Sequence, residues 1–267
     1  MRKIFFSLLT VLLLLSFTAC SEDDNTTDPK IYGYLLEQFV STDAVIQITD
    51  PSAEANTDFR DLYTYEIVAS DGYSPRNSSN AGYDLDWDVL KAGYIVPDDN
   101  RRTWFDNPDM PGAFRVKDAT NLRLYRKVDI EDSLGTTYYV ELGSLPVHQI
   151  ENWDGELEDA IKLSDLLTPF AQYEGVTLYA YDDYAKEYTP EQIQDGYYFP
   201  QSEVSTFPTF NDSMQGGQKK FKKLAGIVVG GVAGSIDYDN AASSSTDLDI
   251  TLPETFGGYE ATELIDY

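Results

Sequence analysis

The chain has 267 residues, of which 46 are Asp or Glu and only 19 are Lys or Arg, so its formal net charge at neutral pH is −27. Such a charge argues against a nucleic-acid partner and against docking on an anionic membrane surface, because both depend on Lys and Arg that neutralise phosphates. A single cysteine, Cys20, leaves no intramolecular disulfide, so any core must hold without cross-links.

The N-terminus has the layout of a secretory signal. Arg2 and Lys3 precede a mostly apolar run over residues 4–19, and a small residue, Ala19, stands before Cys20. The run is shorter than the ~20 residues that a transmembrane helix needs. The pattern therefore predicts a signal peptide over residues 1–19.

The residues around the cysteine carry a resemblance. Phe17-Thr18-Ala19-Cys20 resembles a bacterial lipobox, with Phe17 where that family prefers Leu. The resemblance implies that Cys20 is diacylated through its sulfur and becomes the mature N-terminus, so the membrane is a partner through the lipid. An ordinary signal peptide cut after Ala19 is the alternative.

An acidic stretch follows the cysteine. Glu22-Asp23-Asp24 resembles the surface-export signal of Bacteroidetes lipoproteins. This resemblance implies an outer-membrane protein that is lipid-anchored and faces the cell exterior. Residues 20–30 are polar and acidic, which is typical of a flexible leash.

The sequence repeats the same motifs twice in the same order. Residues 65–73 and 176–184 each carry a β-prone run ending in Ala-x-Asp-x-Tyr, which is typical of a strand that enters a tight turn. Residues 87–97 and 190–200 each indicate a short helix ended by Gly and an aromatic strand ended by Pro. Paired loops and basic, apolar stretches follow at 103–108 and 206–211, and at 121–128 and 219–228.

The repeats predict an α+β fold of two related units packed as a pseudo-symmetric pair. The first unit is expected over residues 31–139 and the second over residues 140–229. Residues 230–267 form a low-complexity tail. Within it, residues 248–252 either add an edge strand or stay disordered.

The order of motifs in each unit carries a second resemblance. Residues 160–167 form a leucine-rich segment before the strand and the Asp-x-Tyr turn, and residues 69–74 contain the sharper Asp-Gly-Tyr turn. This series resembles the C-terminal part of the sulfite-oxidase-type, molybdopterin-binding oxidoreductase domain. That family holds molybdenum by a protein thiolate, and the only thiol here, Cys20, lies on the leash. The resemblance therefore implies a relative without the cofactor.

The two Asp-x-Tyr turns are candidate sites. Each either faces a ligand or is a tight turn, in which Gly supplies a positive φ and Asp adopts it at a steric cost. Their candidate residues are Asp71, Gly72 and Tyr73 in the first unit and Asp182, Asp183 and Tyr184 in the second.

Basic residues cluster at matching places in the two units. They either form anion sites, for example for sulfated or uronic glycans, or neutralise acidic loops and protect strand edges. The candidates are Arg123, Arg126 and Lys127 in the first unit and Lys220, Lys222 and Lys223 in the second.

The sequence has no complete motif for a metal site or a catalytic site. Asp84-x-Asp86-x-Asp88 has calcium-like spacing but lacks the full loop. The sole histidine, His148, excludes a zinc site built from several histidines. We predict no metal, no cofactor and no catalytic residue.

The leading expectation is a lipid-anchored, non-enzymatic surface module that binds a glycan or a protein partner, with aromatic and basic residues of both units converging on one exposed groove. One alternative is an enzyme, either oxidoreductase-like or a hydrolase with two facing carboxylates in a pocket. Another is a structural subunit, which would carry an exposed apolar patch.

Overall fold

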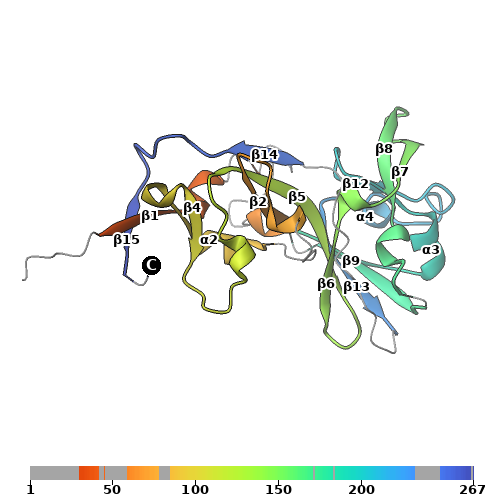
Figure 1. Cartoon of the computed structure of the whole chain (residues 1–267). Coiled ribbons are helices and arrows are strands. Elements are labelled where there is room, and N and C mark those ends of the chain that lie inside the picture. The colour runs from red at the N-terminus through yellow and green to blue at the C-terminus, as the bar shows by residue number, and fades with distance from the viewer. Residues whose placement is uncertain are drawn as a thin grey trace, which may run out of the picture. The chain divides into compact units, whose positions relative to one another are not determined.

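Three β-sheets carry most of the structure, a computed structural model that describes residues 30–41, 45, 59–77, 85–170, 172–182, 184–231, 247–265 and 267 (Figure 1). The signal peptide, Cys20 and residues 21–29 lie outside the described residues, so the lipid anchor stays a prediction. Residues Ile31–Tyr267 form one compact unit.

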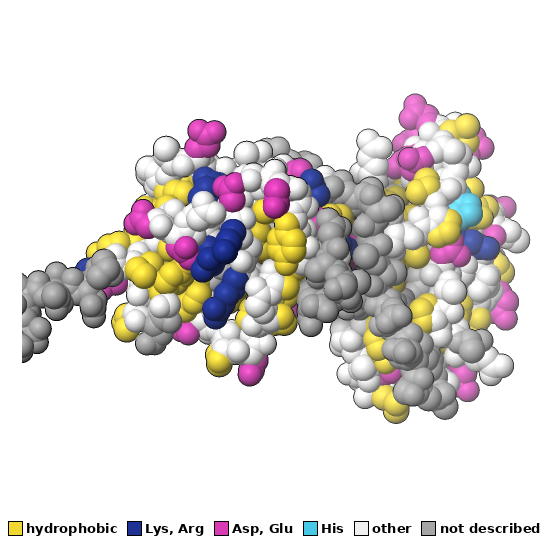
Figure 2. All heavy atoms as spheres, viewed as in Figure 1, with side chains coloured by type: hydrophobic (Ala, Val, Ile, Leu, Met, Phe, Trp, Pro, Cys, Tyr) yellow, Lys and Arg dark blue, Asp and Glu magenta, His cyan; other side chains and the backbone are white. Residues whose placement is uncertain are grey.

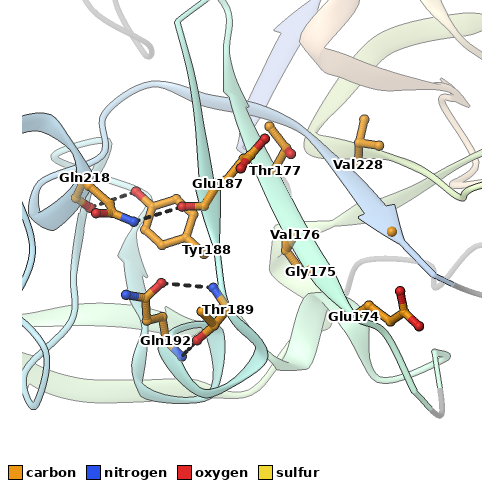
Figure 3. A pocket seen from close by; sticks show the side chains of 11 residues that line it. Glu174, Gly175, Val176, Thr177, Glu187, Tyr188, Thr189, Gln192, Gln218 and Val228 are labelled. Carbon is orange, nitrogen blue, oxygen red and sulfur yellow. Dashed lines mark hydrogen bonds between the residues drawn. The ribbon is translucent and has the colours of Figure 1, made fainter.

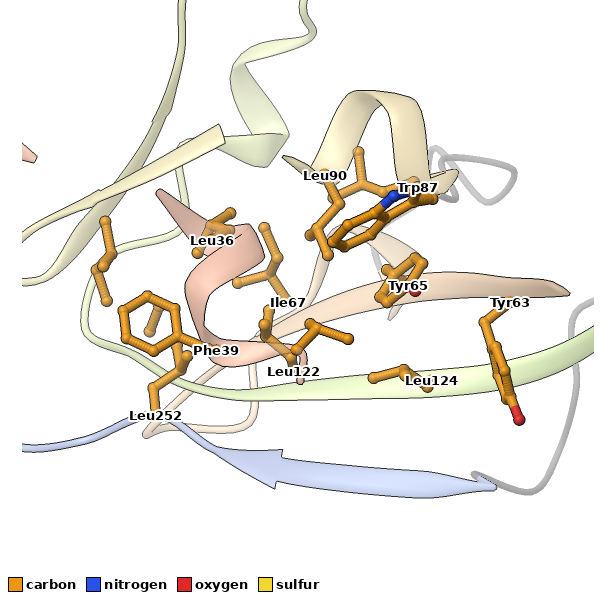
Figure 4. Close-up of a cluster of buried hydrophobic side chains, with 14 of the residues drawn as sticks. Leu36, Phe39, Tyr63, Tyr65, Ile67, Trp87, Leu90, Leu122, Leu124 and Leu252 are labelled. Carbon is orange, nitrogen blue, oxygen red and sulfur yellow. The ribbon is translucent and has the colours of Figure 1, made fainter. Parts of the chain in front are cut away.

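Two sheets enclose the first of two main hydrophobic cores. One sheet is antiparallel in the order β15 (Ala261–Leu264), β1 (Ile31–Leu35), β3 (Gly93–Val96) and β4 (Arg102–Phe105). The other is formed here by β2 (Tyr63–Ala69), β5 (Ala119–Glu131) and β14 (Leu248–Thr251). Figure 4 shows Leu36, Ile67 and Leu122 among the side chains packed in this core. We call this part of the unit the first half.

The second half is built around the other main core, again with two sheets. The larger sheet continues through β6 (Thr137–Glu141), β9 (Gly175–Ala180), β10 (Ala185–Tyr188) and β13 (Leu224–Gly230). The smaller sheet has the order β12 (Val204–Thr206), β11 (Tyr197–Phe199), β8 (Leu157–Lys162) and β7 (Val147–Glu151). Apolar side chains of both sheets, such as Leu178 and Tyr198, meet in the core between them.

Strand β5 belongs to both halves (Figure 1). Its 13 residues span about 40 Å at the usual strand rise. Its first part pairs with β2 and β14, and residues 127–131 pair with β6 while residues 129–131 run parallel to β13. Its side chains alternate, because leucine, valine and isoleucine at even positions are buried in the cores while mostly polar residues occupy the odd positions.

The helices of the described residues are short. The α-helices are α2 (Trp87–Lys91), α3 (Pro190–Asp195) and α4 (Gly216–Lys219). Single 3₁₀ turns are η1 (Leu36–Phe39), η2 (Phe59–Leu62), η3 (Pro75–Asn77), η4 (Pro97–Asp99), η5 (Gly112–Phe114), η6 (Leu142–Ser144) and η7 (Asp165–Leu167). None of the described helices is long and apolar enough to cross a membrane.

The α+β expectation is right only in its coarse form, because the fold mixes helix and strand but strands dominate it. The expected helix starts do exist. Asp86 caps α2 by accepting from the Val89 amide at 2.8 Å, and Thr189 and Gln192 form a capping box at the start of α3. Each helix then ends within two turns, because β-prone aromatic segments follow at once.

The C-terminal residues return to the first half. Of the two alternatives for residues 248–252, the structure has the edge strand, because β14 (Leu248–Thr251) pairs antiparallel with β5. The chain then buries Leu252 and Phe256 in the first core, where the Phe256 ring stacks on Tyr34 with 4.7 Å between centroids. Strand β15, which the sequence analysis did not anticipate, adds to the edge of the other sheet beside β1.

Candidate functional site

The outer face of the large sheet in the second half is the best candidate site. Five strands, in the order β10, β9, β13, β5 and β6, place small and polar side chains there. Paired residues of neighbouring strands share a face. One row across the strands is Glu187, Thr177, Val228, Glu131 and Thr137, and the next is Ala185, Tyr179, Gly226, Asp129 and Tyr139.

Two open hollows adjoin on this face. One has a volume of about 550 Å³ and its lining includes Glu174, Thr177 and Glu187. The other has a volume of about 540 Å³, and Asp129, Glu131, Thr137, Tyr179 and Gly226 contribute to its lining. Val228 lines both, so the two hollows adjoin, and we call them together the outer groove.

Hydrogen bonds fix one wall of the groove (Figure 3). The Tyr188 hydroxyl donates to the Gln218 carbonyl oxygen at 2.7 Å, and Gln218 Nε2 donates to the Glu187 carbonyl oxygen at 2.9 Å. Burial raises the pKa of the Tyr188 phenol, so it remains a donor at neutral pH. The capping box of Thr189 and Gln192 holds the start of α3 beside them.

The floor of the outer groove is low because Gly226, on the central strand β13, carries no side chain. A methyl group at Gly226 would meet only the Asp129 carbonyl oxygen at 3.5 Å and the Tyr179 Cβ at 3.9 Å, which are ordinary contacts. No steric conflict therefore requires glycine here. A larger side chain at this position would instead fill the hollow.

The groove is acidic. Asp129, Glu131, Glu174 and Glu187 line it, and among the described residues no Lys or Arg lines either hollow. Lys127 lies beside it, with its Nζ 2.9 Å from Asp129 Oδ1 and 5.6 Å from the centre of the Tyr139 ring. The electrostatic potential of the groove therefore favours neutral or cationic ligands over anions.

The two predicted turns exist but lie apart from each other. In the first, Gly72 has a φ of 84° and Asp71 Oδ1 accepts from the Tyr73 amide at 2.9 Å. In the second, the Ala180 amide donates to the Tyr184 carbonyl oxygen at 2.8 Å. Asp182 Oδ1 accepts weakly from the Tyr184 amide at 3.4 Å, and Asp183 lies outside the described residues.

The separation of the turns follows from β5. The first turn lies beside Asp118, directly before β5, because the Ser70 amide donates to the Asp118 carbonyl oxygen at 3.0 Å. The second turn lies beside Lys223, because the Tyr181 amide donates to the Lys223 carbonyl oxygen at 3.1 Å. The next residue, Leu224, accepts a hydrogen bond from Arg126, so this turn lies near residue 126 of β5. From residue 119 to residue 126 the strand rises about 23 Å. The two turns therefore form no common site.

The predicted basic residues of the first unit mostly contact groups of the chain itself. Arg126 points inward, is 6 % exposed, and donates to the carbonyl oxygens of Leu62 and Leu224 at 3.4 and 2.6 Å. Arg123 Nε donates to Asp249 Oδ2 at 3.2 Å, and this hydrogen bond raises the pKa of the guanidinium.

Two of the three basic residues of the second unit lie near its Asp-x-Tyr turn or near the loop between β7 and β8. Lys223 Nζ is 3.6 Å from Asp182 Oδ2, and Lys220 Nζ lies 5.3 Å from the centre of the Trp153 ring. Lys222 is exposed. In the part of the chain that the structure describes, none of the six predicted basic residues lines the outer groove. Figure 2 likewise shows basic side chains in separate small groups among acidic ones on the face in view.

The remaining polar candidates have structural contacts. The His148 ring packs edge-on against Tyr197, and its Nε2 lies 3.7 Å from Asp165 Oδ2. Asp86 caps α2, and Asp88 contacts Lys91. Among the described residues, no group of three or more potential ligands could hold a metal ion; Asp84 lies outside them.

Comparison with known proteins finds no match for this chain among family models, curated proteins or solved structures. The resemblances to surface lipoproteins and to the molybdopterin-binding domain therefore stay predictions. The geometry of the outer groove stands by itself as the basis for a function.

Proposed function

We propose that this chain is a lipid-anchored module on the outer face of the outer membrane that binds a glycan or a protein partner without catalysis. The observation that carries the proposal is the outer groove, two adjoining hollows with a hydrogen-bonded wall, a glycine in the floor and one exposed tyrosine. Tyr179 is 39 % exposed, and such a ring can pack on a sugar or on a side chain of a partner.

The site differs from the one that the sequence suggested. We propose binding at the outer groove rather than at the six basic residues, because the arginines and Lys223 have acidic or carbonyl partners within the chain. The acidic lining supports a neutral or cationic ligand.

We further propose that the two halves descend from one repeated unit. In support, Asp118 and Lys223 both have a left-handed backbone, with φ of 52° and 61°. The Asp118 amide donates to the Asn100 carbonyl oxygen at 2.8 Å, and the Lys223 amide donates to that of Glu203 at the same distance. Asn100 and Glu203 themselves share a φ of 53°.

Matching strand pairs add support for a repeat. In the first half β1 pairs with β3 and β3 with β4, while β2 pairs with β5. In the second half β8 pairs with β11 and β11 with β12, while β9 pairs with β13. All six pairs are antiparallel, and the strands follow one another in the same order along the chain. This topology is what a cofactor-free relative of a duplicated domain would retain.

A groove variant tests the binding function. Gly226→Val should fill the outer groove while keeping the fold, because a Cβ there makes only ordinary contacts and valine favours strands. Gly257→Val is the matched control, since nothing lies within 4 Å of a Cβ at that position. We would measure the melting temperature against panels of glycans, peptides, pterins and calcium. A ligand at a hundred times its Kd should add roughly 2.7 kcal/mol.

The two variants decide the outcome. A shift in the native protein and in Gly257→Val, but not in Gly226→Val, would support the groove. A shift that survives in Gly226→Val would move the binding site elsewhere and overturn the proposal. A pterin shift would favour the oxidoreductase alternative.

The anchor needs its own test. Cells that express the native chain should incorporate an alkyne-labelled fatty acid into it, and Cys20→Ala should abolish the label. Protease added to intact cells should degrade the native protein if it faces the exterior. Labelling without degradation would keep the anchor but contradict the outward orientation.

A hydrolase is the second candidate, because Asp129 and Glu131 are two positions apart on one face of β5 and both line the groove. Their Cα atoms are therefore about 7 Å apart, which brings both carboxyl groups to one hollow, as a two-carboxylate hydrolase needs. Release of reducing sugar by the native protein, and its loss in both Asp129→Asn and Glu131→Gln, would establish this alternative.

A further inference from the structure

We propose that the outer groove takes an extended, Lys- and Arg-rich segment of a partner protein. This inference rests on the proposed binding function and names the class of ligand. It starts from the lining of the groove, where acidic side chains occur at both ends and no described basic side chain contributes. A cationic segment is the occupant that this charge distribution complements.

The spacing of the acidic residues fits an extended chain. Glu187 and Glu131 lie in one row of the sheet, with β9 and β13 between their strands. Three strand spacings separate them by about 14 Å. An extended peptide repeats its side chains on one face about every 7 Å, so positions i and i+4 of a segment that crosses the strands would reach both carboxylates.

Tyr179 supplies a second kind of contact. It lies in the adjoining row, between Ala185 and Gly226, and its ring is exposed. The stem of a lysine or the plane of an arginine can pack on such a ring, and the cation gains from its negative face. The small neighbours leave the ring accessible from above.

Two other ligand classes fit less well. An anionic glycan would meet like charge at every acidic residue of the groove. A neutral glycan would gain hydrogen bonds to carboxylates, but it would also cover several charges without neutralising them, and covering an unpaired charge is costly. A cationic polypeptide avoids both penalties.

The test compares peptides of equal charge and different spacing on the full-length protein, processed by its host and solubilised in detergent. The probes are fluorescein-labelled Lys-Thr-Lys-Thr-Lys-Thr and Lys-Lys-Lys-Thr-Thr-Thr, read by fluorescence anisotropy at 50 and 300 mM salt. We expect the alternating peptide to bind at least threefold more tightly and to weaken about tenfold at the higher salt, where charges are screened.

Charge variants locate the binding. Glu131→Gln with Glu187→Gln should weaken the alternating peptide about tenfold. Asp106→Asn with Asp109→Asn removes the same number of exposed charges from the first half and should change its affinity less than twofold. Equal loss in both double variants, or equal affinity for the two peptides, would mean binding by overall charge and would overturn the inference.

A neutral hexasaccharide separates this inference from the proposed function. If it binds independently of salt and of the two glutamates, but not to Gly226→Val, the groove is a glycan site. The binding function then stands and the cationic ligand is wrong. If no probe responds to Gly226→Val, both the inference and the proposed function fail.

Discussion

Arg126 and Leu224 join the two halves, because Arg126 Nη2 on β5 donates a 2.6 Å hydrogen bond to the carbonyl oxygen of the first residue of β13. The guanidinium is buried and also lies 3.9 Å from Glu203 Oε1. Glu203 in turn accepts from the Tyr181 hydroxyl at 2.8 Å. A single charged side chain thus connects a strand of the first half to the start of the second core.

Replacing Arg126 should therefore be costly. Arg126→Met would remove the positive charge beside the buried Glu203 and the donor to three carbonyl oxygens, and removing one partner of a buried pair costs about 3–5 kcal/mol. Arg123→Met is the control, because Arg123 and its hydrogen-bond partner Asp249 are both partly exposed, and such a pair is worth less than about 1 kcal/mol. Urea unfolding measures both. Equal losses would contradict a special role for Arg126.

Two neighbouring tyrosines on β2 should respond oppositely to loss of the hydroxyl. The Tyr65 hydroxyl donates to the Arg60 carbonyl oxygen at 2.8 Å, so Tyr65→Phe should cost about 1 kcal/mol. The buried Tyr63 hydroxyl has no hydrogen-bond partner among the described residues, so Tyr63→Phe should be neutral or stabilising. Thermal unfolding of the two variants checks the order, and a larger loss for Tyr63→Phe would be contrary to it.

Glycines at matching places in the halves should tolerate no methyl group. A Cβ on Gly93 would lie 2.4 Å from the Phe105 ring, and one on Gly196 would lie 2.6 Å from Leu163 and 2.8 Å from Phe207. Gly93→Ala and Gly196→Ala should each cost about 1–3 kcal/mol through overpacking. Gly257→Ala should cost little, because its surroundings are open. If either core glycine tolerates alanine as well as Gly257 does, the close packing described here is wrong.

Asp247 should make stability fall as pH rises. Burial raises its pKa above 3.8, although the Arg126 amide donates to its Oδ2 at 2.5 Å. The folded state therefore holds this proton more tightly than the unfolded state. The stabilising contribution is fully present below pH 3.8 and is lost as pH rises through the folded pKa.

Asp247→Asn removes that dependence and can still accept from the Arg126 amide. Relative to the native protein, its melting temperature should rise between pH 4 and pH 7, because only the native chain loses stability on ionisation of this carboxyl group. A difference that stays constant across this range would contradict the raised pKa.

Local sequence patterns predicted several helices, turns and strands of the fold. The short helices that begin at Trp87 and Pro190, the tight turn at Gly72 and the strand at residues 248–251 all follow from short-range rules. The apolar residues at even positions from 122 to 130 are likewise typical of a strand with one buried face, although Arg126 interrupts them. Arg126 occupies one of these even positions and is buried. A prediction from its charge alone placed it in an exposed anion site.

The outer groove could not be foreseen in the same way. Its acidic residues come from β5, from β10 and from Glu174 directly before β9. Strands β5 and β10 are more than fifty residues apart in the chain and meet only through β9 and β13. The register of those strands decides which side chains share a row, and no local motif encodes it. The place of β15 depends likewise on an edge of β1 that lies at the far end of the sequence.

The pairing of Ile31 with Leu264 makes the first and last strands of the folded unit neighbours. Strand β15 is synthesised after every other strand described here, so this sheet can be completed only late in folding. Because these strands are neighbours, the protein should accept circular permutation. A short linker would join β15 to β1, and new termini would be placed in an exposed hairpin such as β7–β8. Such a permuted chain would keep every strand pair while starting its synthesis in the second half.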